Sequence, residues 1–85
     1  MLNKLIAMLN ENKGDLAINE FNDLGETTLH LANLLNMFAT VGEADGKIYV
    51  DIEEYYPEEE QYYLVATKEY KTPKGAYNFI KKMLP

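Results

Sequence analysis

The stretch KIYVDIE, residues 47–53, decides the fold of this chain, because apolar and polar side chains alternate along it without a break. Ile48, Val50 and Ile52 lie on one side, and Tyr49, Asp51 and Glu53 lie on the other. A period of two after an Asp-Gly turn is typical of a half-buried β-strand. We therefore expect one side of this segment in the core and the other at the surface.

A second strand is predicted over residues 61–70, and Pro57 marks the loop that joins the two strands. Regular alternation would place Tyr62, Leu64 and Ala66 on one face and Tyr63, Val65 and Thr67 on the other. One of the two adjacent tyrosines would then face the core while the other faces outward. The two strands are expected to form an antiparallel hairpin with an acidic tip.

Three other segments carry apolar residues at helical spacing. The first covers residues 2–12. The second is entered through Thr27 or Thr28, is closed by Gly42, and is expected to be the central core helix. Its apolar positions are Leu31, Leu34, Leu35 and Phe38. The third begins at Thr72, the N-cap, with a proline at its first helical position. Its apolar positions are Ala76, Phe79, Ile80, Met83 and Leu84.

Residues 15–21 fit either a strand or a helix, and Asp15 as an N-cap favours a short helix. The sequence thus predicts one α+β domain over residues 1–85. Its expected parts are two or three N-terminal helices, an antiparallel β-hairpin and a C-terminal helix packed on the sheet. A chain of 85 residues has one modest core and little spare stability.

The chain contains no cysteine, which excludes disulfides, a cysteine nucleophile and thiolate metal sites. Absence of cysteine fits a reducing compartment, and we expect a cytoplasmic protein. The apolar residues 1–9 are too few for a membrane span and lack a cleavage signal. We therefore expect no membrane association.

The charge is negative overall and unevenly distributed. The net charge is -6, and all eight basic residues are lysines. Residues 43–60 carry eight carboxylates against one lysine, whereas the residues that follow them are basic. Arginine is the usual reader of guanine and the preferred partner of phosphate, so a chain without it is not expected to bind nucleic acid directly.

No pattern in the chain indicates catalysis or a cofactor. His30 is the only histidine, and we expect it to be a partly buried structural residue on the second helix. An Asp-Gly sequence at residues 45–46 resembles part of a calcium loop, but Ile52 occupies the position that needs a bidentate glutamate. We therefore expect no catalytic residues, no metal and no other cofactor.

The C-terminal segment YKTPKGAYNFIKK, residues 70–82, resembles an ending found in small proteins of Firmicute phages and mobile elements. Small size, acidity and lack of cysteine are also similar to phage inhibitors of host defence, including anti-CRISPR and anti-restriction proteins. Some of those inhibitors imitate nucleic acid. The resemblance implies a non-enzymatic inhibitor and no catalytic residues.

The sequence favours a protein that binds a partner through its acidic hairpin. The expected partner is a host protein with a basic, nucleic-acid-binding surface, where carboxylates would replace phosphates and tyrosines would act as anchors. The expected binding residues are Asp51, Glu53, Glu54, Tyr55, Tyr56, Glu58, Glu59, Glu60 and Tyr63. The alternative is a structural or homodimerisation domain that associates through the last helix or the free hairpin edge, with a merely solubilising acidic face.

Overall fold

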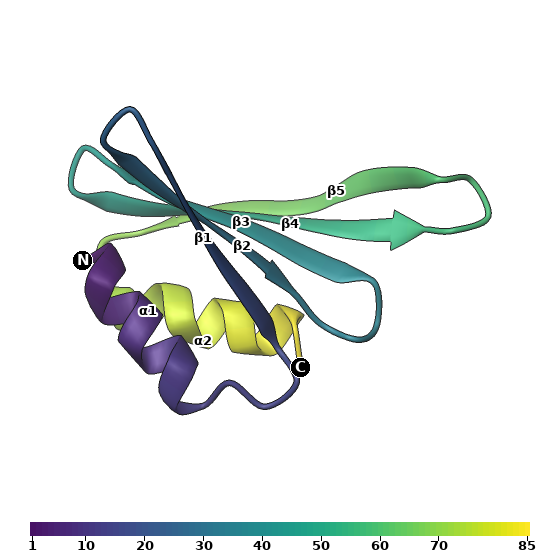
Figure 1. Cartoon of the computed structure of the whole chain (residues 1–85), viewed down its shortest axis with the longest axis horizontal. Helices are drawn as coiled ribbons and strands as arrows, with labels where there is room; N and C mark the ends of the chain where they lie inside the picture. Colours follow the sequence, from purple (N-terminus) through teal and green to yellow (C-terminus); the bar gives the residue numbers. More distant parts are fainter.

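The computed structural model describes residues 1–85 as a five-stranded antiparallel sheet with two helices (Figure 1). The helices are α1 (Leu2–Glu11) and α2 (Pro73–Met83). The strands are β1 (Ala17–Asp23), β2 (Glu26–Ala32), β3 (Met37–Ala44), β4 (Lys47–Tyr56) and β5 (Gln61–Tyr70). Each strand pairs with its neighbour in the chain, so the order across the sheet is β1-β2-β3-β4-β5. The predicted α+β class and the C-terminal helix on the sheet are confirmed.

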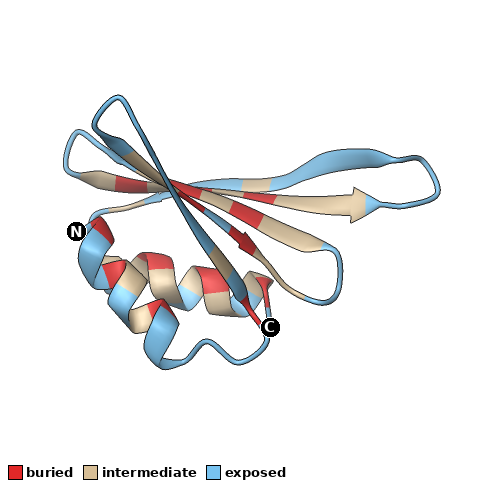
Figure 2. Ribbon diagram, viewed as in Figure 1, coloured by how far each residue is buried: buried red, intermediate tan, exposed pale blue.

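Both helices cover the same face of the sheet, and the core lies between them and the strands (Figures 1 and 2). Every buried side chain is apolar, and the largest come from both layers. These are Leu5, Leu9, Leu29, Leu31, Val41, Ile48, Val50, Ile52, Ile80 and Leu84. The predicted inward side of β4 is therefore confirmed. The opposite face of the sheet has no helix over it.

The two helices form at the predicted ends of the chain. In α2 the Thr72 hydroxyl accepts a hydrogen bond from the Gly75 N–H at 3.1 Å, and Pro73 occupies the first turn. Lys81 and Lys82 lie in the last turn, where positive charge complements the helix dipole. Helix α1 presents its apolar stripe to α2 and the sheet.

Two hairpin turns require left-handed backbone at both central residues. Asp45 and Gly46, between β3 and β4, have φ of 54° and 72°, as the predicted Asp-Gly turn requires. Leu24 and Gly25 join β1 to β2 in the same way, with φ of 51° and 81°. Leucine is unusual at such a position, because a left-handed backbone crowds its Cβ against the following carbonyl.

The preference for a short helix over residues 15–21 is wrong, because this segment enters β1. Strand β1 pairs in register with β2, from Ala17 opposite Ala32 to Asp23 opposite Glu26. Asp15 therefore caps no helix. Leu16 is buried, Ile18 is partly buried, and Ala17 between them is exposed, so alternate side chains of this segment face the core as in a strand.

The predicted central helix from Thr27 or Thr28 to Gly42 is also wrong, because the segment forms β2, a loop and β3. Leu34 and Leu35, which supported the helical pattern, lie in the loop with 76% and 67% of their surface exposed. The chain reverses at residues 33–36, where the Asn33 side-chain oxygen accepts from the N–H groups of Leu35 and Met37. Asn36 then takes a left-handed φ of 62°.

Strand β5 has the predicted bounds but not the predicted faces. Ile52 pairs with Ala66, whereas the next residue, Glu53, pairs with Leu64, so Val65 is an extra residue in a β-bulge. The bulge shifts the alternation, and Leu64 lies on the opposite face from Ala66. Neither Tyr62 nor Tyr63 reaches the core, since 54% and 44% of their surfaces are exposed.

Candidate functional site

The outer half of the β4–β5 hairpin extends beyond both helices (Figure 1). The core contact of β4 ends at Ile52, directly before the bulge. Past this point neither face of the hairpin is covered by a helix, and Tyr62, Tyr63, Leu64 and Val65 are all exposed. We call residues 53–64 the outer hairpin.

Asp51, Glu53 and Tyr55 lie on the helix-free face of β4, as the alternation of the strand requires. Asp51 is opposite Thr67, whose hydroxyl donates a hydrogen bond to the Asp51 carboxylate at 2.9 Å. Glu53 and Tyr55 are half-buried between neighbouring strands. The expected outward direction of Asp51 and Glu53 is confirmed.

Glu54, Tyr56 and Tyr63 lie on the other face of the outer hairpin. Glu54 is paired with Tyr63 in the strand register. The negative charge of Glu54 raises the pKa of the Tyr56 phenol above its usual value, because it disfavours a phenolate nearby. The structure therefore divides the expected binding residues between two faces.

Glu58, Glu59 and Glu60 form the exposed tip. The chain turns through Pro57 and is closed by hydrogen bonds from Glu59 N–H to the Tyr56 carbonyl at 3.2 Å and from Glu60 N–H to the Pro57 carbonyl at 3.3 Å. Glu60 has a left-handed φ of 53°. Such a backbone is normally taken by glycine or asparagine, so a glutamate here is locally unfavourable.

Aromatic rings pair across the outer hairpin and its neighbour β3. The ring centres of Tyr55 and Tyr62 are 4.7 Å apart, and those of Phe38 and Tyr62 are 5.3 Å apart, on the helix-free face. On the other face the rings of Tyr56 and Tyr63 are 5.1 Å apart. Contacts of this kind stabilise a two-stranded segment that lacks a core.

The helix-free face contains a shallow groove of about 440 Å³. It is lined by Asn19, His30, Phe38, Thr40, Glu53 and Tyr62 above the backbone of the central strands. His30 is exposed on β2, with its ring centre 4.7 Å from that of Phe21, so the expected helical, partly buried histidine is wrong. Glu53 belongs to both the groove and the outer hairpin.

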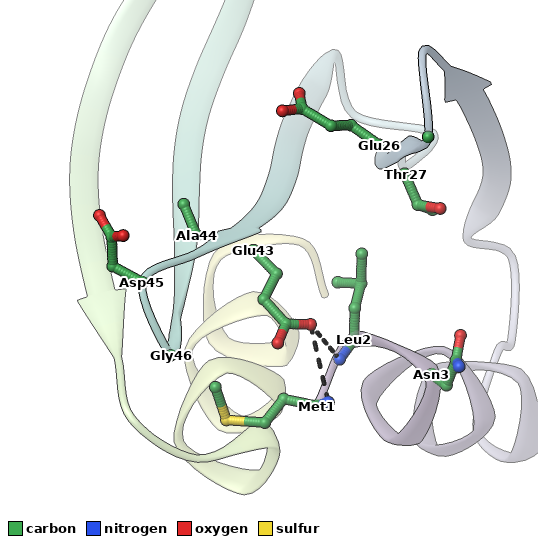
Figure 3. Close-up of a pocket in the computed structure, with 10 residues that line it drawn as sticks. Met1, Leu2, Asn3, Glu26, Thr27, Glu43, Ala44, Asp45 and Gly46 are labelled. Carbon is green, nitrogen blue, oxygen red and sulfur yellow. Dashed lines mark hydrogen bonds and ion pairs between the residues drawn. The ribbon is translucent and has the colours of Figure 1, made fainter.

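A second hollow, of about 420 Å³, lies where α1 begins (Figure 3). Its Glu43 side chain points toward the start of the helix and accepts a hydrogen bond from the Leu2 N–H at 2.9 Å. The same carboxylate is 3.6 Å from the Met1 amino group. Glu43 thus caps α1 from β3, which has a structural role in place of the missing side-chain N-cap.

Sequence reasoning missed Asn19, Phe38, Thr40 and Tyr62 as site residues. Phe38 was assigned to a helix core, and the other three carry no motif. The alternation of Phe38 and Thr40 on one side with Ala39 and Val41 on the other was the available signal. It indicates a strand with one face out of the core.

No group of three or more histidine, cysteine, aspartate or glutamate side chains is arranged to hold a metal ion. No helix is long and apolar enough to cross a membrane. Comparison with protein-family models, with curated proteins and with solved structures finds no match to this chain. The resemblance to phage inhibitors therefore stays a prediction.

Proposed function

We propose that this chain is a non-enzymatic protein-binding domain that inhibits its partner by covering a basic, nucleic-acid-binding surface with the outer hairpin. One observation carries the proposal. The five carboxylates of the outer hairpin, from Glu53 to Glu60, and that of Asp51 just before it take part in no ion pair. The ion pairs within the chain use Glu43 and Glu69 instead.

Unpaired carboxylates on paired strands favour binding to a cationic surface. The backbone positions of Asp51, Glu53 and Glu54 are set by the β4–β5 register. Hydrogen bonds within the turn hold Glu59 and Glu60, so little backbone entropy is lost when these carboxylates meet a partner. Their combined field attracts a basic protein and repels nucleic acid, which speeds encounter with the former. Phosphate-binding surfaces of proteins are rich in lysine and arginine and are suitable targets.

The tyrosines supply contact area beside the charges. Tyr55, Tyr56 and Tyr63 present rings with polar tips on the outer hairpin, and such side chains are enriched in protein interfaces. The left-handed Glu60 supports the same proposal. A residue that is unfavourable for the turn is expected where function rather than stability sets the sequence.

The proposal is tested by capture of partners from a lysate of the source organism at low and high salt. The decisive variant changes Glu58, Glu59 and Glu60 to glutamine. A matched control removes the same charge from exposed positions elsewhere, as Glu11→Gln, Glu20→Gln and Asp23→Asn. We expect the captured protein to be one that binds nucleic acid, and we expect salt or competing nucleic acid to release it. The hairpin variant should fail to capture this protein, whereas the control variant should still capture it. Capture that resists salt, or that survives the hairpin variant, contradicts the proposal.

A second candidate function is homodimerisation through the free edge of β5. The observation that favours it is a run of exposed, uncharged residues, Tyr62, Tyr63, Leu64 and Val65, on an edge strand. Exposed apolar edges invite pairing with another strand. The bulge at Val65 and the charge of -6 on each copy oppose it. Sedimentation over a range of concentrations distinguishes a tight dimer from a monomer.

A dimer through the last helix has less support. Ala76, Ile80 and Leu84 are buried against the sheet and α1, which leaves Phe79 and Met83 as the partly buried apolar residues of this segment.

A further inference from the structure

The groove on the helix-free face is formed by the register of all five strands. Two rows of side chains cross the sheet side by side. One row is Asn19, His30, Thr40, Asp51 and Thr67, and the next is Ala17, Ala32, Phe38, Glu53 and Leu64. The small residues Ala32 and Thr40 lie in the middle of the groove. The rings of Phe21 and His30 flank them on one side. The rings of Phe38 and Tyr62 flank them on the other. The hollow exists because small side chains are flanked by rings.

The charges on this face are negative and leave Glu53 free. Lys47 is the only lysine that the register places on the helix-free face, and it is held by Glu69 at 3.2 Å. Asp51 is engaged by the Thr67 hydroxyl. Glu53 lines the groove, has no ion-pair partner and lies next to Phe38 and Tyr62. A cation that entered the groove would meet this carboxylate together with aromatic rings.

We propose that the groove binds an extended, arginine-bearing segment of a basic partner protein, with the guanidinium on the Glu53 carboxylate and beside the edge-to-face pair of Phe38 and Tyr62 rings. This inference rests on the proposed function and names a second, chemically specific contact beside the acidic tip. The groove runs from Asn19 on β1 to Tyr62 on β5, about 19 Å at ordinary strand spacing, which suits a short stretch of extended backbone. Asn19 and Thr40 offer acceptor oxygens along that stretch.

Arginine fits the site better than lysine for two physical reasons. Its planar guanidinium stacks on aromatic faces while it donates two parallel hydrogen bonds to one carboxylate. An ammonium is more strongly hydrated and makes a single-point contact, so it loses more on leaving water. The aromatic rings and the single carboxylate at this end of the groove offer both of these contacts to one guanidinium.

The test uses two short peptides of glycine and serine that carry either arginines or lysines at the same positions. Each is titrated into the isotopically labelled protein, and the amide resonances are followed. We expect the arginine peptide to shift the signals of Asn19, Thr40 and Glu53, and the lysine peptide to bind several-fold more weakly.

Glu53→Gln is the deciding variant, since it keeps the shape of the side chain and removes its charge. We expect about a tenfold loss of affinity for the arginine peptide, as for a lost charge-assisted hydrogen bond. Glu20→Gln is the matched control, because it removes the same charge from an exposed position on the opposite face of β1, outside both the groove and the outer hairpin, and we expect less than about a twofold change in affinity from the loss of long-range attraction. Phe38→Leu is a second variant, with the thermal unfolding of each protein measured beside its affinity.

The inference is overturned if the groove signals do not move, if both peptides bind equally, or if Glu53→Gln and Glu20→Gln reduce the affinity by the same factor. Failure of the two proposals can be told apart. If loss of charge at Glu58, Glu59 and Glu60 abolishes partner capture while Glu53→Gln leaves it intact, the hairpin function stands and the groove has no role. If the arginine peptide binds the groove but partner capture is unchanged by the loss of charge at Glu58, Glu59 and Glu60, the groove binds arginine and the proposed role of the tip is wrong.

Discussion

The two halves of the β4–β5 hairpin are built from the same pair of strands but have opposite surroundings. In the inner half, Ile48, Val50 and Ile52 are completely buried under α2 and the rest of the core. In the outer half, Tyr62, Leu64 and Val65 are exposed, and the carboxylates have no ion pairs. The bulge at Val65 is the boundary. The outer hairpin is therefore held by strand pairing and aromatic contacts, whereas burial in the core anchors the inner half.

The largest expected effect breaks the inner half. Ile52→Ala should lower the free energy of unfolding by about 2 to 5 kcal/mol, because it leaves a cavity in a closed core. Val65→Ala on the exposed side of the boundary should change it by less than about 1 kcal/mol, as surface substitutions usually do. Urea denaturation followed by circular dichroism measures both. An equal decrease in the free energy of unfolding for the two variants would mean that Val65 contributes to the core as Ile52 does.

Hydrogen exchange compares the halves without any substitution. The backbone amides of Val50 and Ile52 should exchange only when the whole protein unfolds. Hydrogen-bonded amides close to Tyr55 should exchange at least roughly tenfold faster, because the outer hairpin can open locally. Amide exchange followed by magnetic resonance gives both rates. Uniform protection along β4 would contradict the proposed boundary.

Glu60→Asn separates stability from binding at the tip. Asparagine tolerates the left-handed backbone of Glu60, so the free energy of unfolding should rise by about 0.5 to 1 kcal/mol. The same change removes a tip carboxylate and should weaken binding to a basic partner. We therefore expect Glu60→Asn to raise the free energy of unfolding and to lower the affinity for the partner. A gain in both quantities would mean that the tip does not contact the partner.

Leu24→Asn is the matched turn substitution far from the hairpin tip. It creates an Asn-Gly pair in a turn whose two central residues are left-handed, and we expect a stability gain of about 0.5 to 1 kcal/mol. Partner affinity should not change. Thermal unfolding together with the capture assay checks the pair of outcomes, and a loss of capture would indicate that this exposed leucine contacts the partner.

The smallest expected effect is the titration of Tyr56. Glu54 raises the pKa of this phenol, so the folded form disfavours ionisation. The associated stability is present below the usual tyrosine pKa of about 10 and is lost as the pH rises through the higher folded value. Glu54→Gln should lower the pKa of Tyr56 toward the usual value. Ultraviolet titration of the phenol, with Tyr56→Phe to assign the signal, measures the shift.

The hairpin and the terminal helices could be predicted because their signals are local. Alternation over KIYVDIE, the Asp-Gly turn, and the Thr72 cap followed by Pro73 each fix structure within a few residues. The acidic tip was predicted for the same reason, since charge is read directly from composition. The outward side of β4 followed from its period of two.

The helix preferred over residues 15–21 and the helix predicted from Thr27 or Thr28 to Gly42 are wrong because the spacing of their apolar residues fits two structures. Leu31, Leu34, Leu35 and Phe38 have helical spacing, yet only Leu31 is fully buried. The strand pattern of Leu29, Leu31, Ala39 and Val41 was present but interrupted by the loop at residues 33–36. Strand β2 pairs with β1 on one side and β3 on the other, so its backbone N–H and C=O groups are hydrogen-bonded to both neighbours. This pairing outweighs the helical preference of the local sequence.

Local patterns in the chain are enough to predict the β4–β5 hairpin, the two terminal helices and the acidic tip. The five-stranded sheet, the bulge that turns Tyr62 and Leu64 away from Ala66, and the groove lined by Phe38 and Glu53 arise only when the strands pair. The physical reason is that the alternation and the caps act over a few residues. Strand register and the faces it brings together depend on contacts between residues distant in the chain.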